Sequence, residues 1–210
     1  MNKKIGRPRE FNPEDFLMSS LEVFWCKGFH ATSMADLMQV SGLASASIYR
    51  LYPDKKSIFI AALSKYMEDG LRRMESRACE LPPEKALRET LDYCALLSTG
   101  ESGIRGCFTI RAASELLPDD KEVYDKVSYM FHGIKRNLLH ILTLGQKHNI
   151  FRMDTSAEVM AESIFMTLEG MRIYGKVAPD LLSLQRTNSF IMQSVLKPSY
   201  HSFPVVAGDS

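Results

Sequence analysis

The sequence lacks most features that mark membrane, secreted or metal-binding proteins. No apolar run reaches the ~18 residues that suggest a membrane span, and no apolar segment of a secretory signal follows the basic first residues. The four cysteines are widely separated, form no CxxC pair and have no histidine at zinc-ligand spacing. We therefore expect a cytoplasmic protein that has no metal, no cofactor and no membrane partner.

Strand patterns and strong net charge are also missing. Because alternating apolar and polar residues are nearly absent, we predict an all-α fold. The net charge of only +1 disfavours a non-specific architectural DNA-binding protein, since such proteins depend on broad basic surfaces. The five histidines are scattered, so we do not expect an enzyme. A cysteine-dependent enzyme built on Cys107 stays an alternative, because catalytic partners can meet in space without being close in sequence.

The N-terminal part carries signals for three closely spaced helices. Asn12, followed by proline and glutamate, starts the first helix. A second begins at Thr32 or Ser33, and a third runs from about residue 44 to 50, with Gly42 at the turn between them. A short helix persists only when it is packed on others. The third presents serine, tyrosine and arginine outward, as expected of a helix that enters the major groove of DNA.

Further caps and breaks divide the rest of the chain. Asp54 caps a long fourth helix, prolines 82 and 83 start another, and residues 100–106 read as a glycine-rich connector. Long helices follow at about 121–148, 155–176 and 180–197. We expect a DNA-binding domain over residues 10–70, with a helix-turn-helix motif at about 33–52, and an effector-binding and dimerisation domain over residues 71–198.

A basic segment precedes the first helix. Lys3, Lys4, Arg7 and Arg9 place four positive charges in the first nine residues, without a negative one. By itself this is typical of a solvated tail. Directly before a helix-turn-helix, we interpret it as an arm that binds phosphates or enters a minor groove, with Arg7 and Arg9 as its contacts.

One continuous pattern ties these signals together. It consists of Gly6-Arg7-Pro8-Arg9, then Leu21-x-x-Phe24-x-x-x-Gly28-Phe29-x-x-Thr32-Ser33-Met34, then Gly42-Leu43-x-x-x-Ser47-Ile48-Tyr49-x-x-Tyr52-Pro53-x-Lys55. Over residues 6–66 the chain resembles the TetR family of bacterial transcriptional regulators. The resemblance implies a homodimeric, sequence-specific repressor that a small-molecule inducer releases from a palindromic double-stranded DNA operator. A thiol-sensing repressor acting through Cys107 is the alternative.

The resemblance also implies which residues contact DNA. Thr32 and Ser33, at the start of the second helix, suit a phosphate. Tyr49 and Lys55 resemble the backbone contacts of the family. Arg50 suits either a guanine or a phosphate, and Ser45 and Ser47 are further candidates for base contacts. Many members carry Lys or Arg early in the recognition helix, where this chain has Ala44 and Ser45, so the operator cannot be copied from relatives.

Aromatic and methionine side chains of the C-terminal domain are the candidates for an inducer pocket, although such residues at helical spacing also form ordinary cores. Arg111, on an otherwise apolar helix, needs a partner, which we expect to be Glu115, Glu169 or an acidic ligand. Cys107 lies between two arginines near a helix start, which favours the thiolate. The predicted pocket residues are Cys107, Phe108, Arg111, Tyr129, Met130, Phe131, Met166, Met171 and Tyr174.

The helix at about 155–176 is apolar over half its circumference and must bury more than one face. It suits either the centre of a monomer core or a helix shared with a second subunit. We favour the second interpretation, because a two-fold symmetric DNA reader needs a dimer interface. The predicted interface residues are Met160, Ile164, Phe165, Leu168 and Met171.

Overall fold

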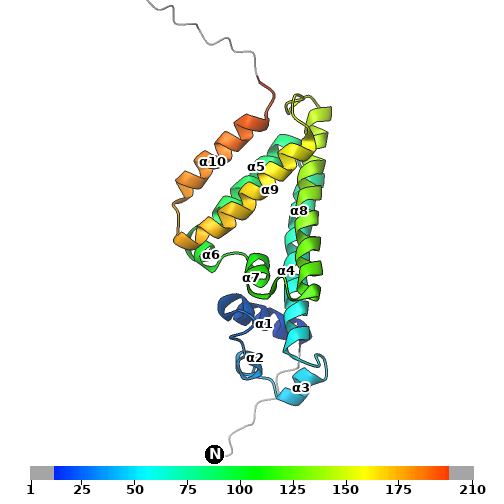
Figure 1. Ribbon diagram of the computed structural model, residues 1–210, viewed down its shortest axis with the longest axis vertical. Helices are drawn as coiled ribbons and strands as arrows, with labels where there is room; N and C mark the ends of the chain where they lie inside the picture. Colours follow the sequence, from blue (N-terminus) through cyan, green and yellow to red (C-terminus); the bar gives the residue numbers. More distant parts are fainter. Residues whose placement is uncertain (1–11, 199–210) are drawn as a thin grey trace, which may run out of the picture.

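The computed structural model describes residues 12–198, and helices make up nearly all regular structure in that range (Figure 1). The only other feature there is an isolated antiparallel bridge between Phe151 and Leu196. The predicted all-α fold is confirmed. No helix among the described residues is long and apolar enough to span a bilayer. The helices are α1 (Pro13–Lys27), α2 (Met34–Ser41), α3 (Ser45–Tyr49), α4 (Lys55–Glu80), α5 (Pro83–Leu97), α6 (Gly100–Arg105), α7 (Phe108–Leu116), α8 (Lys121–Lys147), α9 (Ala157–Tyr174), the short 3-10 helix η1 (Gly175–Val177) and α10 (Leu181–Val195).

The helices begin where local capping chemistry favours a start. The side chain of Asn12 accepts from the backbone N–H of Glu14 at the start of α1, and Ser33 and Asp54 form capping boxes at α2 and α4. Asp120 accepts from the N–H of Val123 at the start of α8. These side chains satisfy N–H groups that have no partner within the helix, so the predicted starts are confirmed.

One stretch differs from the prediction. Residues 100–106, expected as a connector, contain the helix α6. Gly103 lies inside this helix, where a Cβ atom would sit 2.6 Å from the carbonyl carbon of Ser98. This glycine therefore serves the close approach of two backbones rather than a flexible link.

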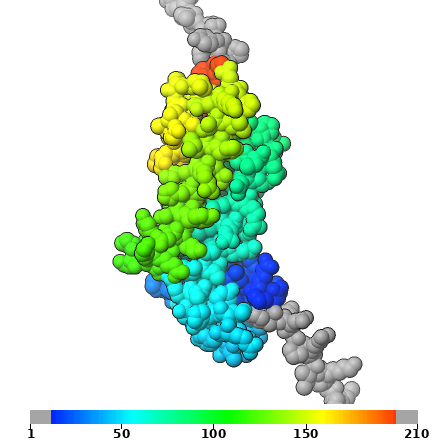
Figure 2. Space-filling model, turned by 90° about the vertical axis from the view of Figure 1, so that its right-hand side faces the viewer, coloured from blue at the N-terminus to red at the C-terminus, as the bar shows by residue number. Residues whose placement is uncertain are grey.

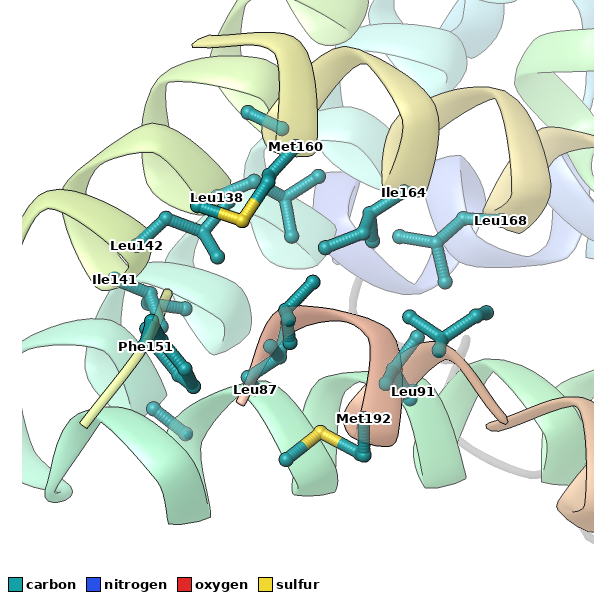
Figure 3. Close-up of a cluster of buried hydrophobic side chains, with 14 of the residues drawn as sticks. Leu87, Leu91, Leu138, Ile141, Leu142, Phe151, Met160, Ile164, Leu168 and Met192 are labelled. Carbon is teal, nitrogen blue, oxygen red and sulfur yellow. The ribbon is translucent and has the colours of Figure 1, made fainter. Parts of the chain in front are cut away.

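Two hydrophobic cores lie along the molecule. The first combines α1 to α4 with α7 and the start of α8, and includes Phe24, Ile48, Phe59 and Phe108. The second joins the far half of α4 to α5, α8, α9 and α10. In Figure 3, Met160, Ile164 and Leu168 of α9 point into this second core.

The two longest helices, α4 and α8, connect the cores. They run side by side along the molecule, and α2 and α3 form one tip of its elongated shape (Figures 1 and 2). Gly133 of α8 permits their contact, because a Cβ there would lie 2.7 Å from a methyl carbon of Leu71.

Helix α7 fixes the turn that leads into α2. The carboxylate of Glu115 accepts from the backbone N–H groups of Phe29 (2.9 Å) and His30 (2.7 Å). The preceding Gly28 has φ +88°, and a Cβ on it would lie 2.6 Å from Glu115 Oε2. A salt bridge between Lys56 and Asp120 joins α4 to the start of α8 close to this turn. The helix-turn-helix is thus held from the C-terminal side of the chain.

We predict that Glu115→Ala lowers the free energy of unfolding by about 1.5–3 kcal/mol, the range for hydrogen bonds to a charged group. The substitution leaves two backbone N–H groups without their acceptor. Urea denaturation followed by circular dichroism measures the change, and Ser114→Ala, at an exposed position of the same helix, is the matched control. Equal stability of the two variants would contradict the role given to Glu115.

Candidate functional site

The surface around α3 combines a buried anchor with outward-facing polar side chains. Ile48 is fully buried and anchors the helix, while Ser45, Tyr49 and Arg50 are exposed and Ser47 is half-buried. Tyr49 keeps 49% of its surface exposed although it is large and partly apolar. Gly42, with φ +66°, makes the left-handed turn from α2 to α3. Four of the predicted DNA-contact residues therefore lie on one short, outward-facing helix and the residue after it.

The two hydroxyls at the start of α2 have different roles. Thr32 is only 1% exposed, and its hydroxyl donates to the carbonyl of Gly28 at 2.6 Å. The prediction that this hydroxyl faces a phosphate is therefore wrong, because it is buried and used inside the turn. Ser33 is exposed and caps α2, where its hydroxyl accepts from the N–H of Asp36.

A carboxylate also occupies this helix start. Asp36 accepts from the backbone N–H of Ser33 at 2.8 Å, and Lys27 Nζ lies 2.6 Å from its Oδ1. The hydrogen bond from Lys27, helped by those from Ser33, holds the pKa of Asp36 far below its usual range. Asp36 therefore stays anionic, and part of the positive end of α2 is already neutralised.

Lys55 lies at the start of α4 and reaches back to the turn after α1. Its ammonium donates to the carbonyls of Phe29 and Thr32, both at 2.8 Å, and lies 4.4 Å from the centre of the Phe29 ring. An ammonium has three N–H donors, so one remains for an outside acceptor. Arg7 and Arg9, the predicted arm contacts, lie outside the described residues.

A second candidate site is a cavity of about 130 Å³ between α4, α5, α8 and α9. Its apolar wall consists of Met74, Leu97, Met130, Ile134 and Leu168. Polar and charged side chains also line it, and they are Tyr66, Arg73, Arg77, Thr90, Tyr93, Cys94, Cys107, Glu169 and Arg172.

Glu169 and Arg172 of α9 are the two charged groups deepest in this site. Glu169 Oε2 is buried without a hydrogen-bond partner, and burial raises the pKa of this carboxyl to about 7 against the opposing effect of Arg172. The Arg172 guanidinium is committed elsewhere, since it donates to the carbonyls of Leu97 and Gly106 and lies 3.5 Å from the Ser98 hydroxyl. The predicted pocket residues include neither Glu169 nor Arg172. Two charged residues on a largely apolar helix were the sequence feature that could have pointed to them.

The carbonyl of Gly106 connects a residue that lines the cavity to helix α1. It accepts from Arg172 Nη2 at 2.8 Å and also from Trp25 Nε1 of α1 at 3.2 Å. We call these three residues the Gly106 junction. Beside it, the Arg105 guanidinium lies 3.7 Å from the centre of the Trp25 ring and pairs with Glu22. A change at Arg172 therefore reaches α1 through one shared acceptor.

Most predicted pocket residues lie elsewhere. Of the nine, Cys107 and Met130 line the cavity. Phe108 and Met171 are buried in the two cores, and Phe131 packs against Phe165. Tyr129, Met166 and Tyr174 are more than half exposed, and Arg111 extends to Gly28, beside Glu115. These seven therefore do not line this cavity, because helical periodicity does not distinguish cavity, core and surface, and their role as ligand contacts stays a prediction.

Two of the four cysteines, Cys94 and Cys107, line the cavity. Cys107 Sγ lies 3.6 Å from the hydroxyl of Tyr66, while its neighbours Arg105 and Arg111 extend towards α1. Burial raises the pKa of Cys94 to about 12, which keeps this thiol protonated. Within residues 12–198, no group of three histidine, cysteine, aspartate or glutamate side chains is arranged to hold a metal ion.

The predicted dimer residues belong to the subunit itself. Met160, Ile164 and Leu168 point into the second core (Figure 3), and Met171 is buried there as well. The prediction is wrong for these four, because α9 is apolar on two faces and this one is covered within the chain. Phe165 is half-buried against Phe131 and stays a prediction.

The other face of α9 stays exposed. Val159, Met166 and Ile173 are 57%, 59% and 57% exposed, seven residues apart, with Ser163 and Gly170 between them. We call these five residues the exposed seam. Their alternating spacing of four and three residues is that of a helix seam that packs against another helix. Phe190 of α10, 71% exposed, adds to the apolar surface presented by these two helices.

Comparison with known proteins agrees with this geometry. Residues 16–62 match the family model described as bacterial regulatory proteins, tetR family. The HTH-type transcriptional repressor ComR of Escherichia coli is 26% identical over 191 residues, which cover 89% of this chain and 90% of that protein. A cysteine mutant of the TetR-family regulator CifR, solved with a 26-base-pair operator, has a TM-score of 0.78 at 22% identity and covers 90% of this chain and 100% of its own. Bacillus subtilis FadR, solved with stearoyl-CoA, has a TM-score of 0.69 at 19% identity, with 87% and 99% covered.

We predict that the burial of Glu169 makes the protein less stable as pH rises. The folded-state pKa of about 7 exceeds the ordinary 4.5, so between these pH values the folded state binds more protons than the unfolded state. The free energy of unfolding therefore falls by about 3 kcal/mol from pH 4.5 to above pH 7.

Urea denaturation of wild type and Glu169→Gln at pH 5 and pH 8 measures this effect. The Arg172 guanidinium, Arg73 and Arg77 of α4, and the thiols and phenols of the cavity are unchanged in both proteins. The variant is expected to lose most of the difference between the two pH values, whereas Glu158→Gln, at an exposed position of the same helix, keeps it. An undiminished difference in Glu169→Gln would contradict the assignment.

Proposed function

This chain belongs to the TetR family of bacterial regulatory proteins, and we propose that it is a dimeric transcriptional repressor that a small molecule releases from a palindromic operator. The observation that carries the proposal is the exposed α3, held by Ile48 with polar side chains facing outward, within the segment that matches the family. ComR is named a repressor, CifR was solved with operator DNA and FadR with stearoyl-CoA. Together these relatives support both a DNA partner and a small-molecule ligand.

We assign the DNA contacts to two groups. Ser45, Ser47 and Arg50 face base edges, because α3 is the helix that enters the major groove. Tyr49, Ser33 and the free donor of Lys55 bind phosphates, which set the position of the protein without reading sequence. Arg7 and Arg9 of the N-terminal arm add phosphate or minor-groove contacts.

We propose that the exposed seam of α9 and the neighbouring face of α10 form the dimer interface. Apolar groups in contact with water favour association with a matching surface. The small residues Ser163 and Gly170 let a partner helix approach closely, and a Cβ on Gly170 would meet nothing within 4 Å in the subunit. The proposal requires that a two-fold axis here set two copies of α3 ~34–36 Å apart, the spacing of successive major grooves.

In this proposal, ligand binding in the cavity is coupled to the position of α3, and this coupling releases the protein from DNA. A ligand that binds the cavity changes the surroundings of Arg172, and the Gly106 junction passes the change to Trp25 of α1. If the ligand prefers a dimer with another spacing of the two α3 helices, it shifts the population away from the DNA-bound form. In this scheme residues 10–70 read DNA and residues 71–198 bind effector and partner, with α4 spanning both.

We propose that the protein is a regulator without catalytic activity. We also propose that it acts in the cytoplasm, where bacterial DNA is located. A thiol sensor or cysteine-dependent enzyme acting through Cys107 is not favoured. Among the described residues the hydrogen-bond partner of its sulfur is the hydroxyl of Tyr66, not a histidine or a carboxylate that would serve as a base.

We predict that Arg50→Ala weakens binding to an operator selected from a random duplex library by about 10- to 100-fold, the range for loss of one bidentate base contact. Binding to a scrambled duplex should fall much less. Fluorescence anisotropy with both duplexes measures this, and Arg136→Ala, an exposed arginine of α8, is the control. An Arg50→Ala protein that still distinguishes the duplexes as well as wild type would refute base reading by this residue.

We predict that Met166→Glu dissociates the dimer, because two carboxylates would face each other across an apolar seam. Sedimentation velocity should show a monomer at concentrations where wild type is a dimer, with at least tenfold weaker operator binding. Tyr124→Glu, at a residue 55% exposed on α8, should remain dimeric. A dimeric Met166→Glu protein would exclude the seam as the interface.

A further inference from the structure

Resting on the proposed ligand-responsive function, we infer that the cavity between α4, α5, α8 and α9 takes a compact, largely apolar molecule that carries no positive charge and donates one O–H or N–H hydrogen bond to Glu169. The inference rests on three properties of the cavity: its volume, its balance of charges and one unsatisfied carboxylate oxygen. Each narrows the ligand independently.

Volume limits the size of the ligand. The cavity measures about 130 Å³, close to the ~150 Å³ of an apolar protein cavity that accepts benzene. Carbon atoms form most of its wall, so a single ring or a short branched chain gains apolar contact there. The cavity is partly open to the surface, so a longer ligand would extend out of it.

Charge disfavours a cation. Arg73, Arg77 and Arg172 line the cavity against the single carboxyl of Glu169, so a cation enters a site that already has a positive surplus. A ligand that brings only acceptors, such as a simple carboxylate, leaves the oxygen of Glu169 without a donor. Arg77 already lies 4.4 Å from the ring centre of Tyr93, and Arg172 is bonded to backbone carbonyls.

The missing element is a donor for Glu169. Its Oε2 is buried and has no partner, and the nearest strong donor on its own helix, Arg172, gives its hydrogen bonds to Leu97 and Gly106. A buried acceptor without a partner is unfavourable by about 1–3 kcal/mol. A ligand O–H or N–H removes this penalty, and a ligand of equal shape without a donor leaves it in place.

The test uses the full-length protein with [methyl-13C]methionine, because Met74 and Met130 both line the cavity. Their signals are assigned with Met74→Leu and Met130→Leu. The probes are phenol, toluene and benzylamine, which share a ring and differ in donor and charge. Binding is measured at pH 8, above the pKa of about 7 of Glu169, so that the carboxyl is mostly ionised. We expect phenol to shift both signals with a Kd about tenfold lower than that of toluene, and benzylamine, cationic at neutral pH, to bind more weakly than phenol.

Substitution at Glu169 isolates the donor contact. Glu169→Leu should bind phenol and toluene equally, while Glu169→Gln, which keeps one carbonyl acceptor, should retain part of the preference. Glu158→Gln should behave as wild type. If toluene binds wild type as tightly as phenol, if benzylamine binds tightest, or if no probe shifts the two signals, the inference is overturned.

Operator binding, measured on the same samples, separates this inference from the proposed function. Loss of the phenol preference together with intact, sequence-specific operator binding removes only the assigned ligand class. Failure of wild type to bind any selected duplex removes the proposed repressor as well. A phenol-bound protein that has lost operator affinity supports both.

Discussion

The carbonyl oxygen of Gly106 is a shared contact between the two halves of the molecule that α4 and α8 connect. It receives the indole N–H of α1 and the guanidinium of α9 at the same time. Gly106 has φ +78°, a backbone conformation that other residues adopt only with strain. The cation–π contact of Arg105 with Trp25 and the carboxylate of Glu115 on the adjacent turn depend on α7 starting where it does. Displacing this loop would therefore release several contacts of α1 together.

The charged side chains around the turn into α2 and those in the cavity form two groups with different consequences. The charged side chains around the turn are paired at short range, as in Lys27 with Asp36 and Lys56 with Asp120. They stabilise one geometry of the turn and of the start of α4. Those in the cavity are incompletely satisfied, because Glu169 has an oxygen without a partner. Charges are thus paired around the turn into α2 and incompletely satisfied in the cavity that we propose for the ligand.

Local chemistry made the helix starts and the exposed polar face of α3 predictable from the sequence. Asn12, Ser33, Asp54 and Asp120 cap the helices that their positions indicated, and α3 exposes the polar residues expected of it. The cavity was not predictable in this way. The raised pKa of Glu169 and the junction at Gly106 arise from packing between helices distant in sequence. For α9, periodicity revealed two apolar faces, but only tertiary contacts decide which of them the subunit covers.

Helix α4 has a mechanical consequence of its own. It runs without a break from Lys55, beside the turn into α2, to Glu80, past the cavity-lining Arg73 and Arg77. Its 26 residues span about 39 Å at 1.5 Å per residue. The segment from Lys55 to Arg73, about 27 Å long at that rise, separates the turn from the cavity. A tilt of about 4° that pivots at the cavity would displace the Lys55 end by about 2 Å over this length. Under such a pivot the helix is a lever arm, and a tilt of a few degrees is enough to misplace the side chains of α3 against a groove.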